Sequence, residues 1–386
     1  MRNSSFTIVL IFILSFSMHS QSLDTLVDVG GYNMHFKIMK GEGTPILFDS
    51  GAGNDGSVWN GILESIHKVT GTTLITYDRS GFGKSELNPN ESDDNKFGIL
   101  NGMKELETGL ELLGFDDDII LVSHSYGGFY NTLYSARHPE KVKYVVMIDA
   151  SIVEFYTDDI ISKWFSTNPI EKTKENLGHY YLMKNLRNSV KIMKETEFPS
   201  DIPVIDIVSA IPWLEKPFTD LDWQSWLDSH KNFVSVKSNI KGITAYGSAH
   251  YIFIDNPGLI INTVIKAYSE TMDEDQQNDI LKKALENAIE LSIEAKKIET
   301  ENLHSEDDLN DWGYSLMESE ELEKALEVFK LNTILFPDSW NVYDSYGEAL
   351  MKSNRKEESI EMYEKSIAMN PENENGKEML LKIKQE

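Results

Sequence analysis

One serine lies where the chain changes from a buried strand to a helix. Residues 119–122 are an apolar run with strand character, and Ser125 follows in the order His-Ser-Tyr-Gly-Gly, just before a helical pattern. A sharp turn at this point lifts the serine hydroxyl out of the sheet, and Gly127 and Gly128 let the helix pass close to it. The pattern predicts that Ser125 is a nucleophile, with an ordinary strand-to-helix turn as the alternative.

A serine nucleophile needs a base, because an unassisted hydroxyl group reacts poorly at neutral pH. Among the nine histidines of the chain, His250 differs from the others because it follows the last predicted strand, residues 243–246. We expect His250 to be the base and the other eight histidines, including His124 beside the nucleophile, to be structural.

Three motifs together resemble the α/β-hydrolase superfamily. The serine turn resembles G-x-S-x-G, from which it departs at Ser123, a residue small enough for a crowded turn. Residues 78–85 resemble the D-R-x-G-x-G-x-S loop of that family, and the segment ending at His250 resembles its Gly-x-x-His segment. The resemblance covers roughly residues 26–271, and it implies a helical cap over the serine at about residues 151–202.

The resemblance also indicates where the acid of a Ser-acid-His triad should lie, to hold the imidazole in the right tautomer. The family most often places this acid after the strand that is here residues 204–208, but the turn that follows has no carboxylate. Asp149 occupies the other place that the family uses, at the end of the preceding strand, and we predict that it is the acid. Asp206 lies in mid-strand, where one face is expected to be buried away from the site. The fallback residues are three acids on the next loop: Glu215, Asp220 and Asp222.

An oxyanion hole must supply N–H donors toward the charge that develops on a carbonyl oxygen. The residue after the nucleophile, Tyr126, is expected to supply one backbone donor. The loop at residues 50–53 is expected to supply the other, from Ala52. This loop lacks the histidine that often opens it in the family. That difference does not affect a backbone N–H donor.

Short apolar runs alternate with helical patterns through the first two thirds of the chain. This alternation predicts an α/β fold with a doubly wound, mostly parallel sheet. An apolar face at spacings of three and four predicts a helix over residues 99–113. The first two strands flank Gly30 and Gly31 as a hairpin. Strands are expected at residues 26–29, 33–38, 45–48, 73–77, 119–122, 144–148, 204–208 and 243–246.

The expected cap is rich in aromatic residues. They could form the wall of an apolar pocket over Ser125, or they could pack together as the core of the cap itself. The residues in question are Phe155, Tyr156, Trp164, Phe165, Tyr180 and Tyr181.

Beyond the expected hydrolase domain, residues 21–271, the pattern becomes helical. Residues 272–304 are predicted to be a helical linker, and residues 305–386 contain a repeat. A glycine, a small residue, an aromatic residue and a proline each recur 34 positions later, which resembles tetratricopeptide repeats. The pairs are Gly313 and Gly347, Ala325 and Ser359, Phe329 and Tyr363, and Pro337 and Pro371.

The N-terminus and the composition limit the location and the partners. Arg2 precedes an apolar stretch, residues 6–16, and small polar residues follow, so residues 1–20 are predicted to be a signal peptide of an exported protein, periplasmic or secreted. An uncleaved anchor is the alternative. A net charge of -27 argues against nucleic-acid partners, and the chain has no cysteine. No metal-binding motif or phosphate loop occurs, and neither a metal nor a cofactor is expected.

These features together predict a serine hydrolase that cleaves a small or apolar carboxylic ester through an acyl-enzyme. Amide, thioester and lactone substrates stay open, because the same residues serve them. Epoxide hydrolases and haloalkane dehalogenases of the superfamily use an aspartate where this chain has Ser125. The alternative function is a non-catalytic binding protein whose repeats recruit a protein partner.

Overall fold

A computed structural model describes most of the chain. The described residues are 22–89, 98–115, 117–167, 173, 176–245, 248–284, 305–318, 321–336 and 338–385. The predicted signal peptide and residues 285–304 of the predicted linker lie outside them. Within the described part, none of the helices has both the length and the apolar character that a membrane span requires.

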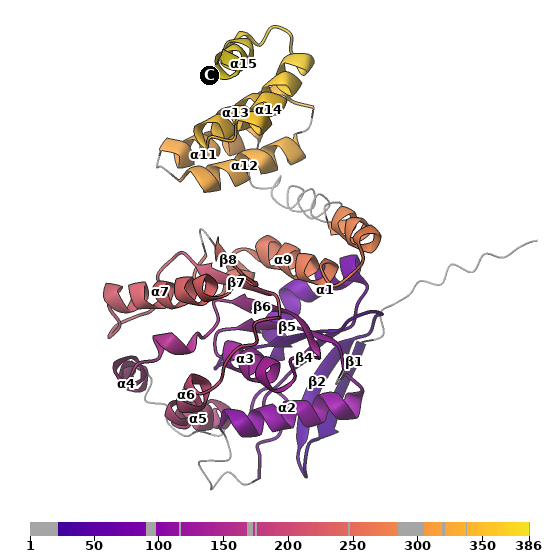
Figure 1. Cartoon of the computed structure of the whole chain (residues 1–386), viewed down its shortest axis with the longest axis vertical. Helices are drawn as coiled ribbons and strands as arrows, with labels where there is room; N and C mark the ends of the chain where they lie inside the picture. Colours follow the sequence, from indigo (N-terminus) through magenta and orange to yellow (C-terminus); the bar gives the residue numbers. More distant parts are fainter. Residues whose placement is uncertain are drawn as a thin grey trace, which may run out of the picture. The chain divides into compact units, whose positions relative to one another are not determined.

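An eight-stranded sheet forms the α/β part of the fold (Figure 1), with the strand order β1-β2-β4-β3-β5-β6-β7-β8. The first two strands pair antiparallel as the predicted hairpin, and β2 runs antiparallel to β4. The strands β4, β3, β5 and β6 are parallel, which confirms the predicted fold class. The strands are β1 Ser22–Asp28, β2 Asn33–Met39, β3 Ile46–Asp49, β4 Leu74–Tyr77, β5 Ile119–His124, β6 Val142–Ile148, β7 Val204–Ser209 and β8 Ile240–Ala245.

Helices cover both faces of this sheet. In Figure 1, α1 lies on one face, whereas α2 and α3 lie on the other. The helix α2 has the predicted bounds and ends at Gly114, whose left-handed φ of 75° is typical of a helix C-cap. The bounds are η1 Gly56–Trp59, α1 Asn60–Thr70, α2 Ile99–Leu113, α3 Gly127–Arg137, α8 Ile252–Asp255 and α9 Pro257–Ser269.

The insertion between β6 and β7 is helical, as the expected cap requires. Its elements are η3 Val153–Phe155, α4 Asp158–Thr167, α5 Leu177–Lys184 and α6 Leu186–Lys194. Two glycines bring the cap close to the loop at residues 78–85: a Cβ on Gly178 would lie 2.6 Å from the Gly81 carbonyl oxygen. Only glycine at both positions allows this approach.

A helix that the sequence analysis did not predict follows β7. The segment that was expected to be a loop becomes α7, Asp220–Val236. The side chain of Asp222 accepts from the Thr219 backbone N–H at 2.7 Å and completes a capping box. It also pairs with Lys163 of the cap at 2.8 Å. Two of the three fallback acids, Asp220 and Asp222, therefore lie in the first turn of a helix rather than in a flexible loop.

The last strand also differs from its prediction. It begins at Ile240 rather than at residue 243. The prediction missed its first residues because Lys241 and Gly242 interrupt the apolar pattern. Its predicted final residue, Tyr246, lies outside the described residues. The strand exposes Lys241 and Gly242, which suits an edge of the sheet.

The chain forms two compact units. The first contains residues up to 67, 71–204 and 215–241, and the second contains residues 68–70, 205–214 and 242–386. The nucleophile turn and the cap belong to the first unit, whereas His250 and the C-terminal helices belong to the second. The predicted domain boundary at residue 271 stays a prediction.

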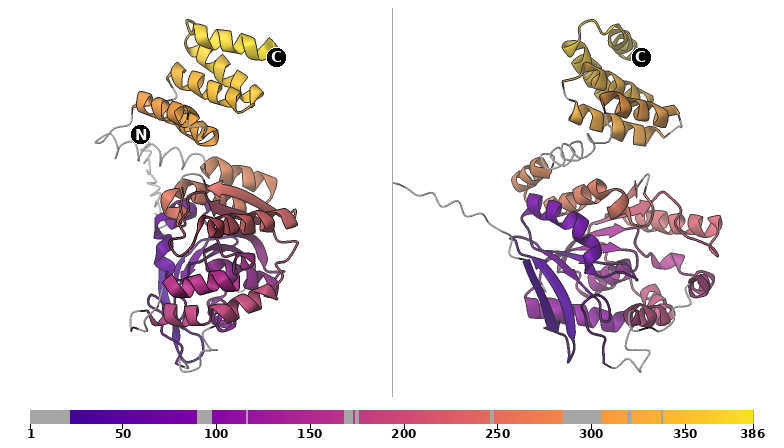
Figure 2. Two further views of the ribbon diagram at one scale, coloured as in Figure 1. Left: turned by 90° about the vertical axis from the view of Figure 1, so that its left-hand side faces the viewer. Right: turned by 180° about the vertical axis from the view of Figure 1, so that it is seen from behind.

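The C-terminal helices form an all-α array (Figure 2). Each helix packs on the next one in sequence, and α11 also contacts α13. Their shared apolar core contains Ala325, Leu326, Phe329, Tyr346, Ala349 and Leu350. The bounds are α11 Glu306–Glu318, α12 Leu322–Leu335, α13 Trp340–Lys352, α14 Lys356–Met369 and α15 Glu374–Gln385.

The contact between α2 and β2 gives a test of this fold. A Cβ on Gly109 would lie 2.3 Å from the ring of Phe36, which is fully buried and cannot move aside. The substitution Gly109→Ala should overpack this contact and lower the free energy of unfolding by about 1–3 kcal/mol. The control is Gly61→Ala in α1, where the new Cβ meets nothing within 4 Å. Urea unfolding followed by circular dichroism should show a lower midpoint for Gly109→Ala alone, and equal midpoints would contradict the packing.

Candidate active site

Ser125 lies at the turn between β5 and α3, in a left-handed backbone conformation. Its φ is 53°, a value that a residue other than glycine adopts only under constraint. Two hydrogen bonds hold the turn: the Ser125 carbonyl oxygen accepts from Ser151 N at 2.7 Å and from Gly128 N at 2.9 Å. The side chain is half-buried, whereas both residues before it, at the end of β5, are buried. The predicted sharp turn at this serine is therefore present.

The two glycines after the nucleophile are needed for close packing. A Cβ on Gly127 would lie 2.7 Å from the Asp49 carbonyl oxygen, and one on Gly128 would lie 2.8 Å from the Ala150 side chain. The start of α3 thus sits between the ends of β3 and β6. No larger residue fits at either position without moving backbone atoms.

Asp149 lies at the end of β6, next to the nucleophile turn. The two strands are paired up to His124 and Ile148, and the Ser151 N–H bond joins the segments beyond them. Asp149 is fully buried and has a left-handed φ of 43°. One of its carboxylate oxygens accepts from Trp226 Nε1 of α7 at 3.1 Å. The sequence analysis missed Trp226, because the helix that carries it was not predicted.

His250 belongs to the second unit, where its ring is held by an aromatic contact. It stacks on Trp213 with ring centroids 3.7 Å apart and an angle of 21° between the planes. The segment before His250 is fixed by the turn after β7, since Ser248 O accepts from Ala210 N and Ile211 N. This turn has no carboxylate, and it contributes an aromatic support that the sequence analysis did not predict.

The loop after β3 passes close to Ser125. A Cβ on Gly51 would lie 3.2 Å from the Ser125 Cβ and 3.1 Å from His124 Nδ1. The next residue is Ala52, one of the two predicted oxyanion donors, and Tyr126 is the other. The first unit thus brings Ser125, Asp149, Ala52 and Tyr126 into one region, whereas His250 belongs to the second unit.

A buried ion pair lies behind this loop. Arg79 Nη2 contacts the Asp49 carboxylate and the Ser50 carbonyl oxygen, and Nη1 donates to the Gly51 carbonyl oxygen at 3.0 Å. The second Asp49 oxygen accepts from the Tyr77 hydroxyl at 2.7 Å. Burial raises the pKa of the Asp49 carboxyl, and Arg79 and Tyr77 oppose that rise. Burial by itself would lower the pKa of Arg79, but Asp49, Tyr77 and Tyr130 together raise that pKa.

The loop at residues 78–85 is organised by the carboxylate of Asp78. It accepts from Gly56 N at 2.9 Å and from Lys84 N at 2.8 Å, and it lies 2.8 Å from His35 Nδ1. A Cβ on Gly83, whose φ is 50°, would lie only 2.2 Å from this carboxylate. Asp78 and Gly83 of the motif therefore stabilise the conformation of this loop.

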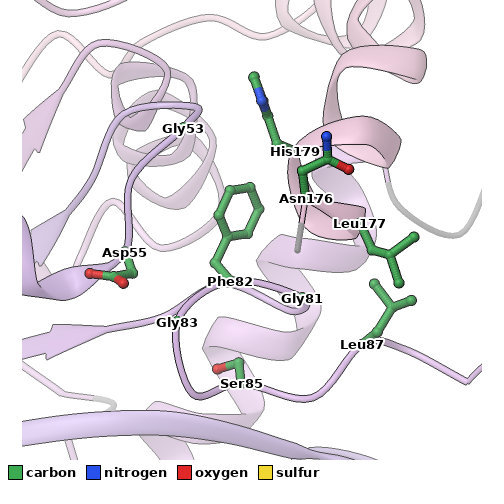
Figure 3. Close-up of a pocket in the computed structure, with 10 residues that line it drawn as sticks. All are labelled: Gly53, Asp55, Gly81, Phe82, Gly83, Ser85, Leu87, Asn176, Leu177 and His179. Atoms are coloured by element: carbon green, nitrogen blue, oxygen red, sulfur yellow. The ribbon is translucent and has the colours of Figure 1, made fainter. Parts of the chain in front are cut away.

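A cavity of about 510 Å³ lies between this loop, the end of the loop after β3 and the helix α5 of the insertion (Figure 3). Figure 3 shows the Phe82 ring pointing between Asp55 on one side and His179 on the other. Burial lowers the pKa of His179, which favours the neutral imidazole at pH 7. The lining is Gly53, Asp55, Gly81, Phe82, Gly83, Ser85, Leu87, Asn176, Leu177 and His179.

The aromatic residues of the cap do not line this cavity. Phe155 packs edge-on against Trp226 at 5.0 Å between ring centroids, and Tyr156 packs on Phe129 at 5.2 Å. Trp164 contacts Phe218 at 4.8 Å. Because Phe129, Trp226 and Phe218 lie outside the expected cap, these three rings pack the insertion against other parts of the first unit rather than forming a core of its own. Among the described residues, no cluster of His, Asp or Glu side chains could hold a metal ion.

The comparisons with known proteins agree with this fold. The family model of the alpha/beta hydrolase fold matches residues 44–179. The uncharacterized protein YqjL of Bacillus subtilis (strain 168) is 24% identical over 245 residues, which are 63% of this chain and 91% of that protein. The (lyso)-N-acylphosphatidylethanolamine lipase of Bos taurus is 34% identical over 106 residues, which are 28% of this chain and only 30% of the lipase.

A solved structure supports this fold. A mutant epoxide hydrolase of Vigna radiata superposes with a TM-score of 0.50 at 16% identity, over 65% of this chain and 99% of that one. The chain therefore has the α/β-hydrolase fold, with an all-helical region after it.

The close approach of Gly51 to Ser125 can be tested by adding one methyl group at Gly51. Gly51 does not need a left-handed backbone, so Gly51→Ala should fold normally and press on the side chains of Ser125 and His124. Hydrolysis of a test ester should slow by about 10-fold or more, because small displacements of reacting groups are costly. The matched control is Gly258→Ala in α9, where the new Cβ meets only Asn256 Oδ1 at 3.9 Å. Equal kcat/KM values for the two variants would contradict this arrangement.

Proposed function

We propose that this protein is a serine hydrolase that cleaves a small or apolar carboxylic ester. Ser125 attacks the ester carbonyl, His250 takes the proton and returns it to the leaving group, and Asp149 orients the imidazole. The backbone N–H groups of Ala52 and Tyr126 stabilise the tetrahedral oxyanion. Water then hydrolyses the acyl-enzyme, and neither a metal nor a cofactor takes part.

The observation that carries this proposal is the geometry of Ser125. A serine with a φ of 53°, held in a turn so close to the next loop that a Cβ on Gly51 would lie 3.2 Å from its own Cβ, is a costly arrangement. An ordinary strand-to-helix turn gives no reason to retain that strain. The buried carboxylate of Asp149, beside the same turn and partly satisfied by Trp226, supports the role of the acid. The relative described as a lipase supports hydrolysis of an ester.

The cavity beside the oxyanion loop is the proposed binding site for one half of the substrate. It has room for a small group, because a volume of about 510 Å³ is in the range of ligand pockets. Apolar side chains (Phe82, Leu87 and Leu177) alternate there with polar ones (Asp55, Asn176 and His179). This mixed lining suits a small group with a polar end. Amide, thioester and lactone substrates remain alternatives within the same mechanism.

The C-terminal helices are proposed to be tetratricopeptide-like repeats that bind a protein partner. The support is a repeated contact: Gly313 faces the ring of Phe329, and Gly347 faces the ring of Tyr363. Both pairs join the first helix of a unit to its second helix, with the same spacing. Export to the periplasm or the medium is proposed from the sequence of residues 1–20 alone.

The mechanism is tested by hydrolysis of nitrophenyl esters from acetate to long acyl chains. Ser125→Ala and Asp149→Asn should each lower kcat by about 10⁴-fold or more, as expected for members of a triad. The matched control is Ser235→Ala, a change to an exposed serine of α7 that bonds only within its own helix. Full activity in Ser125→Ala would exclude the mechanism. Full activity in Asp149→Asn would leave the nucleophile in place and exclude this acid.

A further inference from the structure

Arg79 is a buried cation whose donors are directed at one loop. Of its three hydrogen-bond acceptors among the described residues, one is the carboxylate of Asp49 and two are backbone carbonyl oxygens, those of Ser50 and Gly51. A buried guanidinium needs a charge partner, which Asp49 provides. The bonds to Ser50 and Gly51 go beyond that need, and they fix two consecutive peptide groups just before Ala52.

The orientation of these peptides determines where the next N–H group points. A trans peptide is planar, and its C=O and N–H groups point in opposite directions. Because the Gly51 carbonyl oxygen faces Arg79 at 3.0 Å, the N–H of Ala52 in the same peptide points away from Arg79. A charged donor on the carbonyl also polarises the peptide and makes its N–H group a stronger donor.

The same guanidinium contacts the other half of the proposed oxyanion hole. Its carbon lies 5.7 Å from the ring centroid of Tyr126, the residue after the nucleophile. It also lies 4.8 Å from the ring centroid of Tyr130, one turn further along α3. Both rings are buried, and such cation–π contacts are strongest where water is excluded. One side chain therefore contacts both segments that supply the backbone donors.

We propose that Arg79 is the positioning residue of the oxyanion hole, with Asp49 as the counter-charge that keeps it in place. This inference rests on the proposed function of Ser125. Arg79 does not touch the substrate. It holds the Gly51–Ala52 peptide and the Tyr126 segment so that both N–H groups are fixed before the oxyanion forms, and its charge strengthens the Ala52 donor.

Arg79→Lys tests this role, because an ammonium group on a flexible stem cannot reproduce the planar fork of donors. The expected result is a kcat about 100-fold lower, comparable with the loss of one oxyanion donor, with KM nearly unchanged. The rate at which a fluorophosphonate labels Ser125 should fall in parallel, while the final extent of labelling stays complete. The matched control is Arg137→Lys, which changes an exposed arginine paired with Glu107 at 2.6 Å and should leave kcat unchanged.

A second variant separates positioning from folding. The double substitution Asp49→Leu with Arg79→Met replaces the ion pair by apolar side chains, an exchange that is often neutral or stabilising for a buried pair. We expect a folded protein by circular dichroism with the same loss of kcat and of labelling rate as Arg79→Lys. A folded variant of either kind with native kcat would overturn the proposal. Unfolding of both variants would also overturn the proposal, because the ion pair would then be needed only to stabilise the fold.

Failure of the proposed function would look different. If Ser125 of the native protein took up no fluorophosphonate, the serine mechanism itself would be wrong. If Ser125 were labelled at the same rate in the native protein and in Arg79→Lys, the mechanism would stand and the role of Arg79 would be wrong.

Discussion

The structure depends on close backbone packing around Ser125. The left-handed turn at this residue is held by the Ser151 N–H on one side and by the start of α3 on the other. Gly127 and Gly128 allow α3 to approach β3 and β6 so closely that any Cβ would collide with backbone or side-chain atoms. The strands, the loop after β3 and the segment that carries Asp149 all meet at this point, so a shift in one of them moves Ser125.

The parts of the fold that the sequence predicts are those in which burial follows a simple period. The helix α2 contains all the apolar residues that predicted it, because they recur mostly every three or four positions. The helix α7 was missed for the opposite reason: its buried residues are Asp222, Trp226, Ser229 and His230, and three of these four are polar. The early start of β8 was hidden by Lys241 and Gly242, which face solvent at an edge.

The positions of the candidate site residues were more predictable than the contacts that support them. Ser125 and Asp149 follow strand ends that can be read from the chain, and both have the left-handed backbone that such turns impose. The residues that hold the site come from distant segments: Arg79 is 30 positions from Asp49, and Trp226 is 77 positions from Asp149. Arg79 lies in the motif at residues 78–85, but nothing local in the sequence shows which distant residue it or Trp226 contacts. Only the fold brings them together, and the positioning role that we propose for Arg79 depends on that arrangement.

The most direct measurement is a crystal structure of the native protein after reaction with a small alkyl fluorophosphonate. The account predicts a bond from Ser125 Oγ to phosphorus, with the phosphoryl oxygen about 3 Å from the backbone nitrogen atoms of Ala52 and Tyr126. Arg79 should keep its contacts with the Ser50 and Gly51 carbonyl oxygens in that adduct. A phosphoryl oxygen that faces solvent or lies near neither nitrogen atom, or an adduct on another residue, would contradict the account.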